Sequence, residues 1–169
     1  MAKTNILVPL TKSETSQQIL PQIEKLIPAQ GCKLFLLYVT KPPKGLGFAA
    51  PDFRSDYVLE AGGEPLGPKA HPVYTSQQED SLLADVEVAL LPITNHLKQQ
   101  GYEVAVQIYL GGDTIDEIVR TVKREKIDLV AMSTRAREGV QRLFFGDIAE
   151  RVMQRVNIPV LLIQPQTQT

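Results

Sequence analysis

The chain has 169 residues, of which 43 % are hydrophobic and 22 % are charged, and its formal net charge is −1. These values predict a soluble globular protein with a single domain, residues 1–169, that is long enough to bury a core. The near-neutral charge argues against general binding to nucleic acid or to an anionic membrane. The single cysteine, Cys32, excludes an internal disulfide. The sequence has neither a signal peptide nor an apolar run of about 18 residues, so we expect a cytoplasmic protein.

The first segment alternates between strand and helix patterns. Residues 5–10 are almost continuously apolar, which predicts a strand that is covered on both faces. Ser13 is a candidate N-cap, and apolar residues then recur at helical spacing from Ile19 to Ile27. Pro21 lies inside this pattern and predicts a kink, because proline has no N–H to donate. A second apolar strand is expected at residues 33–39.

A change of composition follows the second strand. Residues 42–80 contain six prolines and five glycines and have no apolar periodicity. This composition predicts a long loop at residues 41–80, because the segment has little to bury. A helical pattern returns from Leu82 to Leu97, with Pro92 inside it, and ends before Gly101.

The last part of the chain repeats the alternation. Strands are expected at residues 103–109, 127–132 and 159–163. Asp113 is placed to cap the helix after the first of them, and another helix starts after Gly146. Strand and helix repeated four times, with a final strand, predict an α/β fold with an open parallel sheet and helices on both faces. The pattern alone leaves the strand order open, and residues 165–169 are expected to form a polar tail.

One stretch, residues 127–150, carries a resemblance to a known family. A buried strand runs into a loop rich in arginine and then into a helix, an arrangement that offers free backbone N–H groups to an anion. Nucleotide-binding members of the universal stress protein family have a glycine, two residues, a glycine, nine residues, a glycine and a serine or threonine here. The positions in this chain are Ser133, Ala136, Gly146 and Asp147. Around them, the segments DLVAMST and GDIAERVMQRVNIPVLLI are similar to the family.

The resemblance also covers the N-terminal strand and residues 101–128, but not about 40 residues after the second strand. It implies a Rossmann-like five-stranded sheet of order 3-2-1-4-5. The switch point would then lie between strands one and four, and ligands would bind beyond the carboxyl ends of these strands. Residues 10–13 would face residues 133–137 at this point.

The family implies an adenine nucleotide, ATP or AMP, at these loops. Thr11 and Val39 would flank the base and ribose, and backbone N–H groups near Ala136, Gly139, Gly146 and Ile148 would meet the phosphates. The full set of expected binding residues is Leu10, Thr11, Val39, Ser133, Thr134, Arg135, Ala136, Arg137, Gly139, Gly146, Asp147 and Ile148.

Several of these positions depart from the family pattern. Ser133 and Ala136 replace glycines that let the backbone approach phosphate, and Thr11 stands where nucleotide-binding members usually have aspartate. Asp147 replaces a hydroxyl, and its carboxylate would repel a phosphate by roughly 1–4 kcal/mol at about 4 Å. Two functions therefore remain open. One is a nucleotide-sensing regulatory protein with at most slow ATP hydrolysis. The other is an interaction protein that does not bind nucleotide and acts through residues 41–80.

Other chemistries find no support in the sequence. Neither the dinucleotide motif nor the P-loop is present. His71, His96 and Cys32 have no metal-ligand spacing, and no nucleophile-elbow motif suggests a hydrolase. We therefore expect no catalytic residues and no metal.

Two parts of the chain are expected to bind partners: a sheet edge near the C-terminus and the segment 41–80. The arginine loop has no aromatic platform for nucleic acid. Under the implied strand order, residues 159–164 (PVLLIQ) form an uncharged sheet edge, which needs cover. The family resemblance implies a homodimer through antiparallel pairing of this strand. A protein partner at residues 41–80 belongs to the interaction-protein alternative.

Overall fold

The computed structural model describes residues 3–41, 56–60, 77–134 and 147–165. The elements in chain order are β1 (Thr4–Leu10), α1 (Glu14–Gln17), α2 (Ile19–Leu26), β2 (Cys32–Thr40), β3 (Asp56–Glu60), α3 (Gln77–Gln99), β4 (Glu103–Leu110), α4 (Thr114–Arg124), β5 (Leu129–Ser133), α5 (Asp147–Arg155) and β6 (Val160–Ile163).

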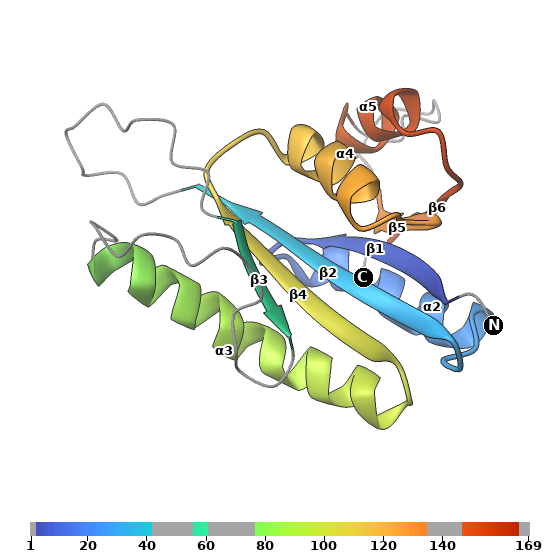
Figure 1. Ribbon diagram of the computed structural model, residues 1–169, viewed down its shortest axis with the longest axis horizontal. Helices are drawn as coiled ribbons and strands as arrows, with labels where there is room; N and C mark the ends of the chain where they lie inside the picture. Colours follow the sequence, from blue (N-terminus) through green and yellow to red (C-terminus); the bar gives the residue numbers. More distant parts are fainter. Residues whose placement is uncertain (1–2, 42–55, 61–76, 135–146, 166–169) are drawn as a thin grey trace.

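One twisted sheet organises these elements (Figure 1). Its order is β3-β4-β2-β1-β5-β6. Every neighbouring pair is parallel except β3 and β4, which are antiparallel. The five parallel strands therefore have the predicted order 3-2-1-4-5, which is confirmed. Apolar runs in β1, β2 and β4 suit this arrangement, because a parallel strand is covered on both faces.

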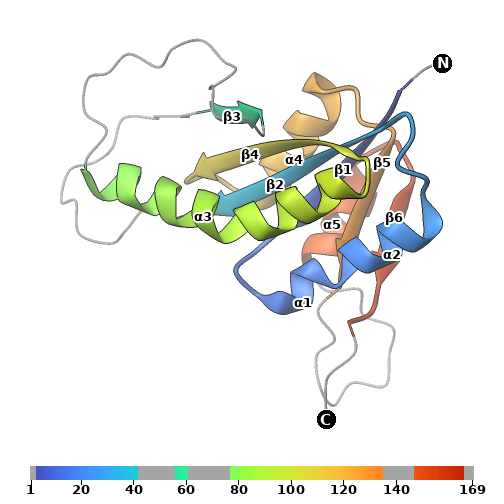
Figure 2. The same cartoon turned by 90° about the horizontal axis from the view of Figure 1, so that it is seen from below.

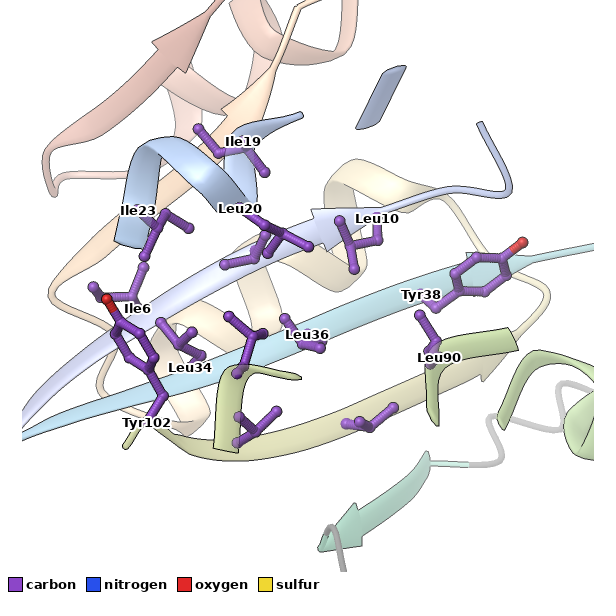
Figure 3. Packing of buried hydrophobic residues seen from close by; sticks show 14 of the residues in the cluster. Ile6, Leu10, Ile19, Leu20, Ile23, Leu34, Leu36, Tyr38, Leu90 and Tyr102 are labelled. Atoms are coloured by element: carbon purple, nitrogen blue, oxygen red, sulfur yellow. The ribbon is translucent and has the colours of Figure 1, made fainter. Parts of the chain in front are cut away.

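Each face of the sheet has its own core. Helices α2 and α3 pack on one face, where Ile19 and Ile23 of α2 belong to the same buried cluster as Ile6 and Leu34 of the sheet (Figure 3). Helices α4 and α5 cover the other face, where the buried residues include Ile118 and Val152. Figures 1 and 2 show α3 and the pair α4–α5 on opposite sides of the strands.

The helix boundaries follow local chemistry. Asp113 caps α4, and its Oδ1 accepts from the N–H groups of Ile115 at 2.9 Å and Asp116 at 3.2 Å. Ser13 caps α1 in the same manner. The kink expected at Pro21 is a break at Gln18 that separates α1 from α2. Pro21 cannot donate to the carbonyl of Gln17, so the helix loses a hydrogen bond at this point.

The structure differs from the expected 41–80 loop at two places. Strand β3 lies inside this segment and pairs with β4, and α3 begins at Gln77 rather than near Leu82. The sequence of β3, DYVLE, has aromatic and branched residues that favour strands. Its pairing satisfies backbone groups that the edge of β4 would otherwise leave open. The other residues of the expected loop lie outside the described part of the chain.

A buried polar network fixes α4 to β4. The side chain of Gln107, in the middle of β4, is fully buried, as is Thr121 of α4. Gln107 accepts from Nη2 of Arg124 at 3.1 Å and donates to Glu125 at 3.2 Å. Arg124 also donates to the Tyr109 hydroxyl. Burial opposes the charge of Arg124, but the hydrogen bonds to Tyr109 and Glu125 outweigh it and raise its pKa. Since each buried group has a partner, the network specifies one position of α4 on the sheet.

Candidate functional site

The candidate site lies at the carboxyl ends of β1 and β5. These strands are neighbours, yet the chain leaves β1 towards β2 on one side and continues from β5 to β6 on the other. Such a reversal opens a crevice beyond the strand ends, where α/β proteins place ligands. The sheet order therefore brings the loop after Leu10 beside the loop after Ser133, as predicted.

The loop after β1 is a compact turn rich in hydroxyl groups. The N–H of Thr11 donates to Oγ of Ser16 at 3.0 Å, and the Ser16 hydroxyl donates to the carbonyl of Ser13 at 2.8 Å. The N–H of Ser13 donates to Oγ1 of Thr11 at 3.2 Å. Thr11 and Lys12 are exposed in this turn. Ser16 thus holds the turn together, although no motif in the sequence points to this residue.

Ser133 joins this turn to β5. Its hydroxyl donates to the carbonyl of Ser16 at 3.4 Å, so the two loops are linked across the switch point. Thr134 is buried, and its hydroxyl donates to the carbonyl of Ile163 in β6 at 3.2 Å. Its backbone N–H donates to the same carbonyl at 2.8 Å. Thr134 therefore holds β5 against β6 through both its hydroxyl and its backbone N–H.

Leu10 and Val39 lie on opposite faces of the sheet. Leu10 is buried in the core under α2 and α3, next to its register partner Tyr38 (Figure 3). Val39 packs against the core under α4 and α5. The sheet separates their side chains, so a ligand at the strand ends would meet both residues only through their backbone. Burial raises the pKa of Tyr38, and a hydrogen bond to the Lys12 backbone partly offsets this.

The start of α5 bears the acid that departs from the family pattern. Asp147 is the first residue of α5, and both Asp147 and Ile148 are exposed. An acid in the first turn is stabilised by the helix dipole. Ile148 is 45 % exposed, while the next residue, Ala149, fixes the helix in the core. The remaining predicted binding residues, Arg135, Ala136, Arg137, Gly139 and Gly146, lie outside the described residues.

Comparison with known proteins decides the family. The model of the universal stress protein family matches residues 3–164.

The chain belongs to the universal stress protein family.

Curated relatives agree with this assignment. One universal stress protein of Methanocaldococcus jannaschii is 34 % identical over 71 residues, which are 40 % of this chain and 42 % of that protein. A second from the same organism is 22 % identical over 159 residues, or 94 % of this chain and 93 % of that protein.

Solved structures share the fold. The structure of that second protein has a TM-score of 0.64 at 18 % identity, and the match covers 99 % of this chain and all of the other. An Arabidopsis thaliana family member with AMP bound has a TM-score of 0.58 at 16 % identity, with 97 % and 93 % covered. The universal stress protein of Archaeoglobus fulgidus in complex with dAMP has a TM-score of 0.59 at 15 % identity, with 97 % and 100 % covered.

The described ranges contain neither a candidate metal cluster nor a candidate membrane-spanning helix. Within them, no group of three His, Cys, Asp or Glu side chains lies close enough to hold a metal ion. Among the helices of the same ranges, none is both long and apolar enough to cross a membrane.

Proposed function

We propose that this universal stress protein binds an adenine nucleotide, ATP or AMP, beyond the carboxyl ends of β1 and β5, and that it has a regulatory role in a stress response. The hydrogen bond from Ser133 to Ser16 carries the proposal, because it joins the two loops at the switch point. The start of α5 at Asp147 is a helix N-terminus, which offers backbone N–H groups to a phosphate. Relatives with AMP and dAMP bound support the choice of nucleotide.

The proposed role does not need turnover. Among the described residues of the site, Thr11, Ser13, Ser16 and Ser133 carry hydroxyls, and each of these hydroxyls already bonds to a backbone group. Hydroxyls in such bonds suit the positioning of a ligand better than attack on it, since a serine nucleophile requires an adjacent base. Binding that changes with the ATP and AMP levels is sufficient for a sensor.

Isothermal titration with ATP, AMP and adenosine tests nucleotide binding. Ser133→Leu should abolish it, because the larger side chain enters the space between the two loops. Thr134→Val is the matched control: it removes a hydroxyl that faces β6 and should leave affinity within about twofold. Equal loss in both variants would place the site elsewhere, and no heat with any nucleotide would reject the proposal.

The second candidate function is an interaction protein with a degenerate nucleotide site. The observation that favours it is the exposed acid Asp147 at the start of α5, where phosphate would bind. The 41–80 segment would then supply the binding surface, and β3 within it stands at the edge of the sheet. This function predicts no response to nucleotide in the titration above.

We also propose that two copies pair through β6. The strand is the last in the sheet, and its four apolar residues are all partly exposed. An uncharged apolar edge favours antiparallel pairing with an identical strand across a two-fold axis.

A further inference from the structure

Helix α3 has apolar residues on two opposite sides. The inner side packs on the sheet through Leu83, Val86, Leu90 and Leu97, all buried. The outer side has Ala84, Val88 and Leu91, which we call the outer stripe. Val88 is 65 % exposed and Leu91 is 52 % exposed, and Ala84 is exposed as well.

The spacing of the outer stripe is that of a helix seam. Its residues are four and three positions apart, so they lie on one line along a helix with 3.6 residues per turn. Single exposed apolar residues are common on protein surfaces. A line with this spacing is the pattern by which one helix packs on another. Figures 1 and 2 show α3 on the outside of the layers.

Acidic residues border the outer stripe on both sides. Asp85 lies on one side of the outer stripe around the helix axis and Glu87 lies on the other, and both are exposed. Among the described residues, neither carboxylate has an ion-pair partner. A second copy of α3 would bring acid against acid, which disfavours self-association. A partner with basic residues beside its own apolar stripe would neutralise both.

Pro92 adds a hydrogen-bond acceptor to this surface. It lies inside α3 and is exposed. Because proline has no N–H, the carbonyl of Val88 lacks its helical donor. A lysine or arginine of the partner can donate to this oxygen.

From these observations we propose that the outer stripe of α3 docks an amphipathic helix of another protein, with an apolar stripe flanked by lysine or arginine. The contact would extend from Ala84 to Asn95, about 16 Å along the helix. Asn95 lies on the same line and is exposed, and a polar residue in a helix seam fixes the register of the partner. The outer stripe shares no residue with the proposed nucleotide site, so the two can be tested separately.

The test uses a fluorescent helical peptide of about 18 residues, with leucines at heptad seam positions and lysines beside them. Anisotropy should report micromolar binding that weakens several-fold when NaCl rises from about 50 mM to about 300 mM. Val88→Asp or Leu91→Asp should weaken binding about tenfold or more. Leu26→Asp is the matched control, since Leu26 is a 59 % exposed leucine on α2, and it should change nothing. The double variant Asp85→Lys with Glu87→Lys should instead prefer a peptide with glutamates in place of the lysines.

Four results would overturn the proposal. The first is absence of binding by the parent protein, and the second is equal binding of the basic and acidic peptides. The third is a lower oligomer mass in Leu91→Asp but not in Leu26→Asp, which would show that a second copy covers the outer stripe. The fourth is a melting temperature that falls by several degrees in Leu91→Asp and not in Leu26→Asp, which would show that another part of the chain packs on it.

Discussion

Replacing Asp147 by serine should strengthen nucleotide binding. The residue opens α5, and its carboxylate is exposed at the helix N-terminus, where a phosphate would also be attracted. The repulsion between two unit charges at about 4 Å is about 1 kcal/mol in bulk water and about 4 kcal/mol at the effective dielectric constant of about 20 that is typical near a protein surface. Because Asp147 is exposed, the lower value applies. We expect about a fivefold gain in ATP affinity per phosphate charge that lies this close.

Titration calorimetry with ATP, AMP and adenosine measures the gain. It should be largest for ATP, small for adenosine, and reduced by added salt because exposed charges are screened. The variant keeps a residue suited to a helix start, so the cost in unfolding free energy is the lost dipole interaction, about 0.3–1 kcal/mol. Glu150→Gln is the control: it neutralises another exposed acid in the first turn of α5, further from the helix start. If adenosine gains as much as ATP, or if Glu150→Gln gains equally, the electrostatic argument for Asp147 is refuted.

Three further predictions concern assembly, stability and reactivity. Leu161→Lys should convert the expected dimer to a monomer in light scattering, whereas Leu26→Lys should not; an unchanged mass would place the interface elsewhere. Asp113→Ala should lower the melting temperature by about 2–4 °C, because it removes a cap worth about 1 kcal/mol, while Asp113→Ser should restore most of the loss. Burial raises the pKa of Cys32 from 9.0 to about 11, so the unfolded chain releases this proton first and stability should fall between pH 9 and pH 11. Urea unfolding of Cys32→Ala should lack that part of the pH dependence, and an identical dependence in both proteins would contradict the burial of the thiol.

Local sequence patterns determined most of the elements. The apolar runs of β1, β2 and β4 and the caps at Ser13 and Asp113 depend on neighbouring residues and on the backbone alone, so they are visible in the sequence. The break between α1 and α2 at Gln18 follows from Pro21 in the same way, because Pro21 cannot donate to the carbonyl of Gln17.

The predicted strand order is confirmed at the candidate site, whereas the hydrogen bonds there were not predicted. The strand order, which the family resemblance supplied, brings Leu10 and Ser133 to one edge. The role of Ser16 as the link between the two loops depends on a contact 117 positions apart in the chain. Likewise, Thr134 has the right residue type for a ligand contact, and only the position of β6 shows that its hydroxyl bonds to Ile163.

Long-range pairing decided the rest. Strand β3 is a short segment between prolines and glycines, and it is a strand because the edge of β4 offers backbone partners. Gln107 is a polar residue in a mostly apolar strand. Only the tertiary structure shows that Thr121 and Arg124 of α4 donate hydrogen bonds to it. The sequence of α3 contains both apolar lines, but which line is buried depends on the face that the sheet covers. No local pattern encodes the hydrogen bonds and packing contacts between distant segments. For this reason, only the tertiary structure shows that Val88 and Leu91 of α3 are exposed.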